Sequence, residues 1–142
     1  AQIGGKAIWT VPTTFVSIMT IGGLFGFFLI IYEFFFVGVG IVFSVILLGF
    51  AISIDKKIPT KIIIFFVGFF GFFHGTAHGI EVPAAANPLL FLLGFICGTT
   101  ALHLFGVAIG YISTKTAISS ILLRLIGISF AIYGIYLLTV IF

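Results

Sequence analysis

Five long apolar stretches divide this chain, and short polar breaks separate them. A membrane-spanning helix needs about 20 mostly apolar residues, and each stretch comes close to that length. We predict membrane helices over residues 9–32, 37–54, 58–77, 88–112 and 117–142. The apolar runs are continuous, whereas the strands of a membrane barrel alternate apolar and polar residues. The pattern therefore predicts an all-α fold, in which residues 1–142 form a single domain, a polytopic transmembrane helix bundle.

The composition excludes a water-soluble globular protein. Hydrophobic residues make up 62% of the 142 residues and charged residues only 6%, whereas about a quarter of the residues in a soluble domain are charged. No nucleic-acid binding is expected, because the basic residues form no run longer than Lys56-Lys57. The one cysteine, Cys97, excludes an internal disulfide, and we expect it to be buried as a small residue, with soft metal ligation as an alternative.

The charges indicate how the bundle is oriented. If five helices alternate in direction, all the basic residues fall on or near one side of the membrane. These residues are Lys6, Lys56, Lys57, Lys61, Lys115 and Arg124. Glu33, Glu81 and the C-terminus then fall on the other side. The positive-inside rule makes the basic side cytoplasmic. The chain opens without a Met or a signal pattern, and we expect a segment upstream of Ala1.

Small residues recur four apart in three of the predicted helices. They are Gly22 and Gly26; Gly71, Gly75 and Gly79; Gly94 and Gly98; and Gly106 and Gly110. In lipid, close backbone approach through small residues drives helix association. We interpret these glycines as packing ridges; the alternative is the lining of a narrow permeation path.

The third helix carries the clearest candidate chemistry. His74, His78 and Glu81 are spaced i, i+4, i+7, which places them on one helical face. Two imidazoles one turn apart form a familiar metal-chelating pair, and the carboxylate supplies a third ligand. The alternative is that these histidines only bond water and head groups at the interface. Ionisable groups at membrane depth usually mark function, so we predict a metal site.

A third histidine, His103, lies well inside the fourth helix, towards the cytoplasmic half. It is interpreted either as an inner metal ligand or as an interhelical hydrogen-bonding group. Imidazole and carboxylate suit nickel, cobalt and zinc. A transporter needs capture at its mouth and weak sites inside, because an ion that binds too tightly never leaves. The predicted route has an outer site at His74, His78 and Glu81 and an inner ligand at His103.

The run from Phe73 to Pro83 resembles the F-H-G-x-A-H-G-x-E-x-P signature of the HupE/UreJ family. Residues 2–12, 44–49 and 102–106 also resemble parts of that family. The resemblance implies a small multi-pass permease of the bacterial inner membrane, implicated in nickel and sometimes cobalt uptake for hydrogenase and urease maturation. It implies no enzyme and no prosthetic group, with the transported Ni²⁺ or Co²⁺ as the ligand.

Two departures from the family pattern concern the completeness of the site. A preceding helix with the motif H-P-x-x-G-x-D-H is absent from this sequence. A glutamate near the start of the second helix is replaced by Gly38. The site is therefore expected to be incomplete in this chain, and an upstream helix or a homo-oligomer is the expected partner.

Two other functions are compatible with the residues. The histidine pair could hold zinc in an intramembrane hydrolase, although that reaction needs a general base and an open coordination position. No acid lies between the two histidines. The chain could also be a structural or assembly subunit of a larger membrane complex, with the histidines at an interface.

Overall fold

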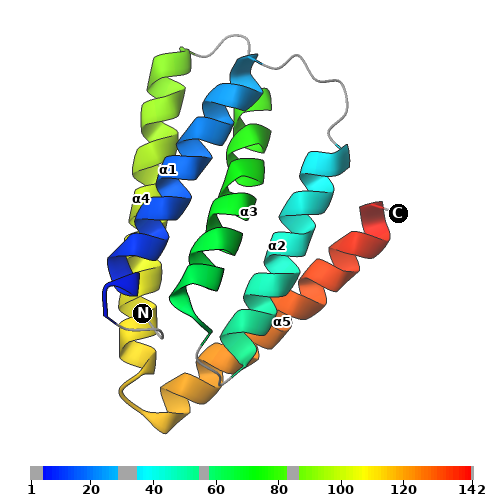
Figure 1. The fold of residues 1–142 in the computed structure, drawn as a ribbon. Helices are drawn as coiled ribbons and strands as arrows, with labels where there is room; N and C mark the ends of the chain where they lie inside the picture. The colour runs from blue at the N-terminus through cyan, green and yellow to red at the C-terminus, as the bar shows by residue number, and fades with distance from the viewer. Residues whose placement is uncertain (1–4, 29–34, 55–57, 83–86, 142) are drawn as a thin grey trace.

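The computed structural model is an all-α bundle (Figure 1). It describes residues 5–28, 35–54, 58–82 and 87–141. The helices are α1 (Ala7–Phe28), α2 (Phe35–Ser53), α3 (Thr60–Ile80), α4 (Pro88–Ser113) and α5 (Ala117–Ile141). All five are long and apolar enough to cross a membrane, and the described residues contain no strand. The predicted fold class is confirmed. Predictions made for Glu33, for residues 55–57, for Pro83 and for Phe142 lie outside the described residues.

Local sequence explains the ends of α3 and α4. Helix α3 continues to Ile80, beyond the predicted end at residue 77, and the N–H of Glu81 still bonds to the carbonyl of Ala77 over 3.0 Å. Asn87 caps α4, because its Oδ1 accepts hydrogen bonds from the N–H groups of Leu89 and Leu90. These N–H groups have no partner within the first turn of a helix. The histidine-bearing end of α3 therefore lies only a few residues before the capped start of α4 in the sequence.

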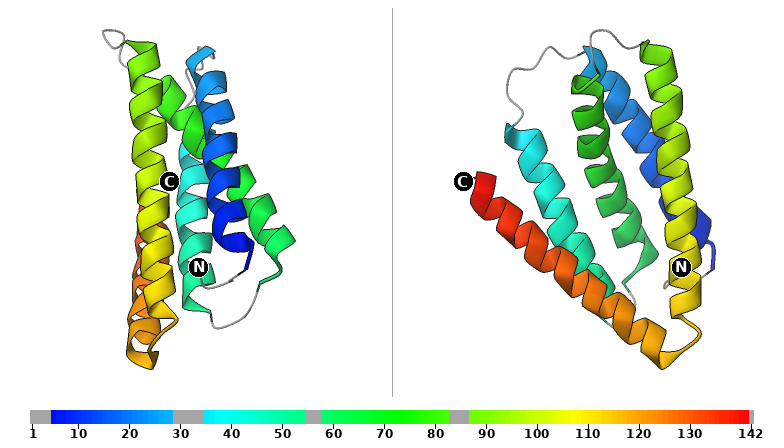
Figure 2. Two further views of the ribbon diagram at one scale, coloured as in Figure 1. Left: turned by 90° about the vertical axis from the view of Figure 1, so that its left-hand side faces the viewer. Right: turned by 180° about the vertical axis from the view of Figure 1, so that it is seen from behind.

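The helices lie in the spatial order α4, α1, α3, α2, α5 (Figure 1). The closest pairs are α1 with α3 and α2 with α5. Helices α4 and α5 meet at their connecting turn and then diverge, so that together they form a V (Figure 2). Helix α4 packs loosely on α1 and is the most open of the helices. The candidate site lies where α1, α3 and the start of α4 meet.

Glycines allow α1 and α3 to touch backbone to backbone. A Cβ atom at Gly22 would meet the Phe72 carbonyl, and one at Gly75 would meet the Met19 carbonyl. The packing role of the α1 and α3 glycines is therefore confirmed. The pairing of Gly49 in α2 with Gly127 in α5 serves the same purpose and was not predicted.

Three of the four α4 glycines do not follow this pattern, whereas Gly110 is buried. A Cβ atom at Gly94, Gly98 or Gly106 would meet no other atom within 4 Å. The interpretation of these three glycines as a packing ridge is wrong for the described part of the chain. Cys97, on the same helix, is exposed rather than buried. The reason is that α4 meets the bundle along one narrow face, and the rest of its surface contacts no described helix.

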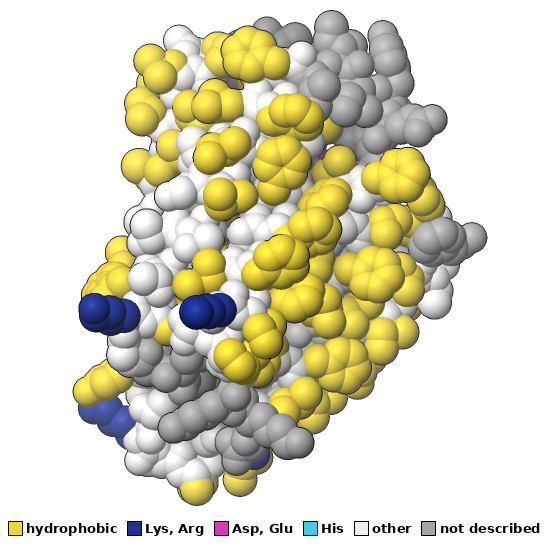
Figure 3. Space-filling view, in the orientation of Figure 1, with side chains coloured by type: hydrophobic (Ala, Val, Ile, Leu, Met, Phe, Trp, Pro, Cys, Tyr) yellow, Lys and Arg dark blue, Asp and Glu magenta, His cyan; other side chains and the backbone are white. Residues whose placement is uncertain are grey.

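The surface is apolar over most of its area, as expected for a bundle surrounded by lipid (Figure 3). Lysine and arginine side chains gather in the lower part of this view. Lys6 precedes α1, Lys61 is in the first turn of α3, and Lys115 lies in the turn between α4 and α5. These three positions are at the same end of the bundle, whereas Glu81 lies at the opposite end (Figure 1). The one-sided distribution of charge predicted from the sequence holds for the described residues.

Candidate metal-binding site

The site is built on the last two turns of α3. Because the helix is regular through Ile80, His74 and His78 stand one turn apart on the same face. The Nδ1 atom of His78 lies 3.8 Å from Oε2 of Glu81, and their side chains are 45% and 64% exposed. His78 and Glu81 therefore form a pair that solvent can reach. The two groups attract each other when the imidazole is protonated.

His74 lies one turn deeper and is half-buried. Its Nδ1 atom is 3.0 Å from the carbonyl oxygen of Phe70. A carbonyl only accepts, so Nδ1 donates and carries the proton. In the neutral ring Nε2 then keeps its lone pair. A hydrogen bond of this kind fixes the tautomer and the ring orientation of many metal-binding histidines.

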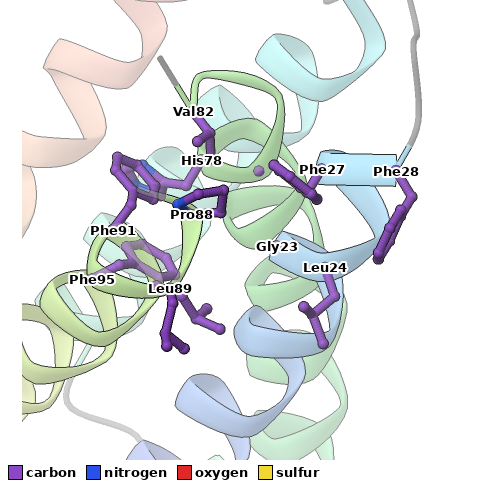
Figure 4. A pocket seen from close by; sticks show the side chains of 12 residues that line it. Gly23, Leu24, Phe27, Phe28, His78, Val82, Pro88, Leu89, Phe91 and Phe95 are labelled. Carbon is purple, nitrogen blue, oxygen red and sulfur yellow. The ribbon is translucent and has the colours of Figure 1, made fainter. Parts of the chain in front are cut away.

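His78 reaches from α3 towards the first turns of α4. Its ring centroid is 4.5 Å from that of Phe95. The side chain lines a cavity of about 250 Å³ between the end of α1, the end of α3 and the start of α4 (Figure 4). The other described residues that line the cavity are apolar, so among them His78 is the ionisable group. We call this space the outer cavity.

His103 lies on α4, nearer the basic end of the bundle. Its Nδ1 atom is 2.9 Å from the carbonyl oxygen of Thr99, so it has the same tautomer as His74 in the neutral state. The side chain lines a second cavity of about 320 Å³ against the start of α1, which we call the inner cavity. The alternative predicted for His103, an interhelical hydrogen bond, is not what the geometry shows, because its hydrogen bond stays within α4.

The structure keeps the outer residues and His103 apart. No group of three or more His, Cys, Asp or Glu side chains is arranged to hold a metal ion within the described ranges. His78 and Glu81 are adjacent, His74 is one turn away, and His103 is on another helix. The donor set of two imidazoles and a carboxylate nevertheless suits borderline divalent metals. These side chains form an open, partial ligand set rather than a closed cage.

Two phenylalanines contact the histidines and were not singled out in the sequence. Phe95 packs on His78. Phe15 of α1 contacts both His74 and His103, with ring centroids 5.7 Å and 4.8 Å apart, respectively. The chain contains 20 phenylalanines, and nothing in their spacing distinguishes these two. Only the packing of α1 against α3 and α4 identifies them.

Comparison with known proteins identifies the family of this chain. The profile of the HupE / UreJ protein family matches residues 1–137. The protein HupE of Rhizobium leguminosarum bv. viciae is 35% identical over 138 residues, which are 97% of this chain and 71% of that protein. No solved structure matches the chain. Because the family profile covers nearly every residue, the chain belongs to the HupE / UreJ family.

Proposed function

We propose that this chain is a permease for a divalent transition-metal ion, with nickel as the first candidate and cobalt as the second. The observation that carries the proposal is the placement of His74, His78 and Glu81 on one face of α3, at the end of the bundle remote from the lysines. Membership of a family of nickel and cobalt accessory permeases supports it. The transported ion is the substrate, and no prosthetic group is proposed.

Capture would take place at the end of α3. The exposed Glu81 carboxylate and His78 would meet the ion first, since both are accessible to solvent. The ion would then pass to the Nε2 atom of His74, which the protein leaves free. An open ligand set of this kind binds an ion without enclosing it. That is what a transport site needs, because the ion must be released again.

Release would involve His103. Its free Nε2 atom lies beside the inner cavity, nearer the basic end of the bundle. We propose that the basic end faces the cytoplasm of a bacterial cell, following the positive-inside rule. Ions would then move inwards from the Glu81 end to the Lys115 end. Further ligands from an upstream helix or a second copy would complete the outer site.

The comparisons give no support to the zinc hydrolase considered from the sequence, because the family is of the transporter type. The described residues also supply no carboxylate between the two histidines to act as a general base. We therefore propose no catalytic role.

The proposal is tested by measuring Ni²⁺ uptake into liposomes that contain the full-length protein. The wild-type protein should raise uptake above that of empty liposomes, and a His74→Ala/His78→Ala double variant should remove the increase. Ser129→Ala is a suitable control, because its hydroxyl bonds only to the Leu125 carbonyl on α5. Uptake that is equal in the wild type and the double variant would overturn the proposal.

A further inference from the structure

The outer and inner cavities lie along one seam of the bundle. Both are lined by α1 and α4, and the outer cavity also borders the end of α3. On α4, Phe95 lines the outer cavity and His103 lines the inner one. His103 follows Phe95 by eight positions, about 12 Å along the helix axis. A stretch of α1 and α4 therefore lies between the two cavities.

The side chain of Phe15 occupies this dividing stretch. On α1, residue 15 follows Pro12 of the inner cavity and precedes Gly23 of the outer cavity. Its ring contacts both His74 of α3 and His103 of α4. These two imidazoles make no direct ring contact with each other within the described residues. The aromatic ring thus contacts both a histidine of the outer site and the histidine of the inner cavity.

Both neighbouring histidines have a second ring nitrogen that can bind an ion. Each uses Nδ1 to bond to a carbonyl of its own helix, so each keeps Nε2 for an ion. The benzene ring that contacts them carries no lone pair that could replace a water or an imidazole on a divalent ion. Burying an uncompensated charge in an apolar constriction is costly, and hydrophobic constrictions close channels by excluding water.

Gly71 gives the ring its space. A Cβ atom at this position would lie 3.3 Å from Cδ2 of Phe15 and 3.3 Å from its carbonyl oxygen. The ring therefore packs against a helix surface that has no side chain at that point. A change at position 71 would press on the ring without touching a histidine.

We propose that Phe15 is the gate of the metal path, closing the passage between the outer histidines and the inner cavity at His103. This proposal rests on the proposed transport function, because a gate has a role only if ions pass through the protein. The barrier itself, however, can be measured without any transported metal. Opening would require the ring to leave its contacts with the two histidines.

The test measures how fast a thiol in the inner cavity is reached from the outer end. The thiol is Val107→Cys, at a residue that lines the inner cavity, in a Cys97→Ser background. A small cationic methanethiosulfonate is added to the Glu81 side of liposomes that contain the full-length protein. With Phe15 present, labelling should be slow. Phe15→Ala should accelerate it by at least about tenfold, because the hydrophobic constriction is removed.

A matched control is Phe25→Ala. Phe25 is on the same helix and packs on α3 through Phe72, with ring centroids 5.3 Å apart, but it contacts neither histidine. It should leave labelling from the Glu81 side unchanged. Labelling from the Lys115 side should be equal in all variants, which checks that the fold is intact. Phe15→Trp keeps a large ring in place and should keep labelling slow.

Fast labelling with Phe15 present, or no acceleration in Phe15→Ala, would overturn the gate. Equal acceleration from both sides of the liposomes, or equal acceleration in Phe25→Ala, would overturn it as well. Uptake of Ni²⁺ by the wild type is measured in the same liposomes. If uptake is absent but labelling depends on Phe15, the proposed transport function fails and the barrier stands. If uptake occurs but the labelling rate is the same with and without the Phe15 ring, the gate is disproved and the proposed transport function is retained.

Discussion

The Nδ1 atom of His78 lies 3.8 Å from Oε2 of Glu81, three residues further along α3. This distance is longer than a strong charge-assisted hydrogen bond, which measures about 2.7–2.9 Å. The two groups therefore lie near each other without being locked together. Either can turn towards an ion that arrives at the end of the helix.

Removing either member of this pair should weaken metal capture. We expect Glu81→Gln and His78→Ala each to lower the affinity for Ni²⁺ by about 10–100-fold, the range seen when groups around a metal site are removed. Isothermal titration calorimetry of the full-length protein in detergent measures the change. Thr139→Ala serves as the control, since its hydroxyl bonds only within α5. An unchanged affinity in both variants would contradict the assignment of the pair.

His103→Ala should reduce the transport of Ni²⁺ without reducing its capture at the outer site. His103 contacts neither His78 nor Glu81 in the structure and lies beside the inner cavity. We therefore expect Ni²⁺ affinity at the outer site to change by less than about a factor of 2, since energetic effects at distant, independent sites are nearly additive. Ni²⁺ uptake into liposomes should fall by at least about tenfold, because the inner ligand of the path is lost. Equal losses of affinity and uptake would show instead that His103 belongs to the capture site.

Substitution of Gly75 should destabilise the bundle, whereas the same change at Gly98 should not. A Cβ atom at Gly75 would meet the Met19 carbonyl, and one at Gly98 would meet nothing within 4 Å. We expect Gly75→Ala to cost about 1–3 kcal/mol of folding free energy, as overpacked interiors do. Gly98→Ala should cost no folding free energy, because its Cβ has open space and alanine favours a helix over glycine. Reversible unfolding in mixed micelles measures both, and similar losses in the two variants would contradict the α1–α3 contact.

The orientation in the membrane is tested at the two ends of the bundle. In a Cys97→Ser background, we expect Glu81→Cys to react with an impermeant thiol reagent added to intact cells. Lys115→Cys should react only after the cells are opened, because the basic end is assigned to the cytoplasm. The reverse pattern would mean that ions enter the path at His103 and leave it at Glu81.

The sequence was sufficient to predict the helices and the face shared by His74, His78 and Glu81. Both depend on local properties, namely the length of apolar runs and the 3.6-residue period of a helix. A packing role for Gly22 was also predictable from the spacing of small residues, but its partner α3 was not, and the same spacing at Gly94 and Gly98 has no packing role among the described residues.

The exposure of Gly98 and Cys97 and the position of Phe15 could not be predicted in the same way. Lipid-facing and helix-facing positions in a membrane bundle are both apolar, so hydrophobicity does not tell the inside from the outside. Phe15 resembles every other phenylalanine until α3 and α4 are placed around it. The pairing of helices is the information that the apolar pattern lacks.

The last prediction concerns pH. A histidine binds a metal ion through an unprotonated nitrogen, so protons compete with the metal. Histidine ordinarily titrates near pH 6.5, and Ni²⁺ affinity should therefore fall as the pH is lowered from 8 to 5. If His74 and His78 both bind the ion, the fall should be steeper than in His78→Ala, which retains one imidazole. Glu81→Gln should keep the direction of the effect, because the histidines remain. Calorimetric titrations across this pH range provide the measurement. An affinity that stays flat, or that rises as the pH falls, would mean that these histidines do not bind the ion.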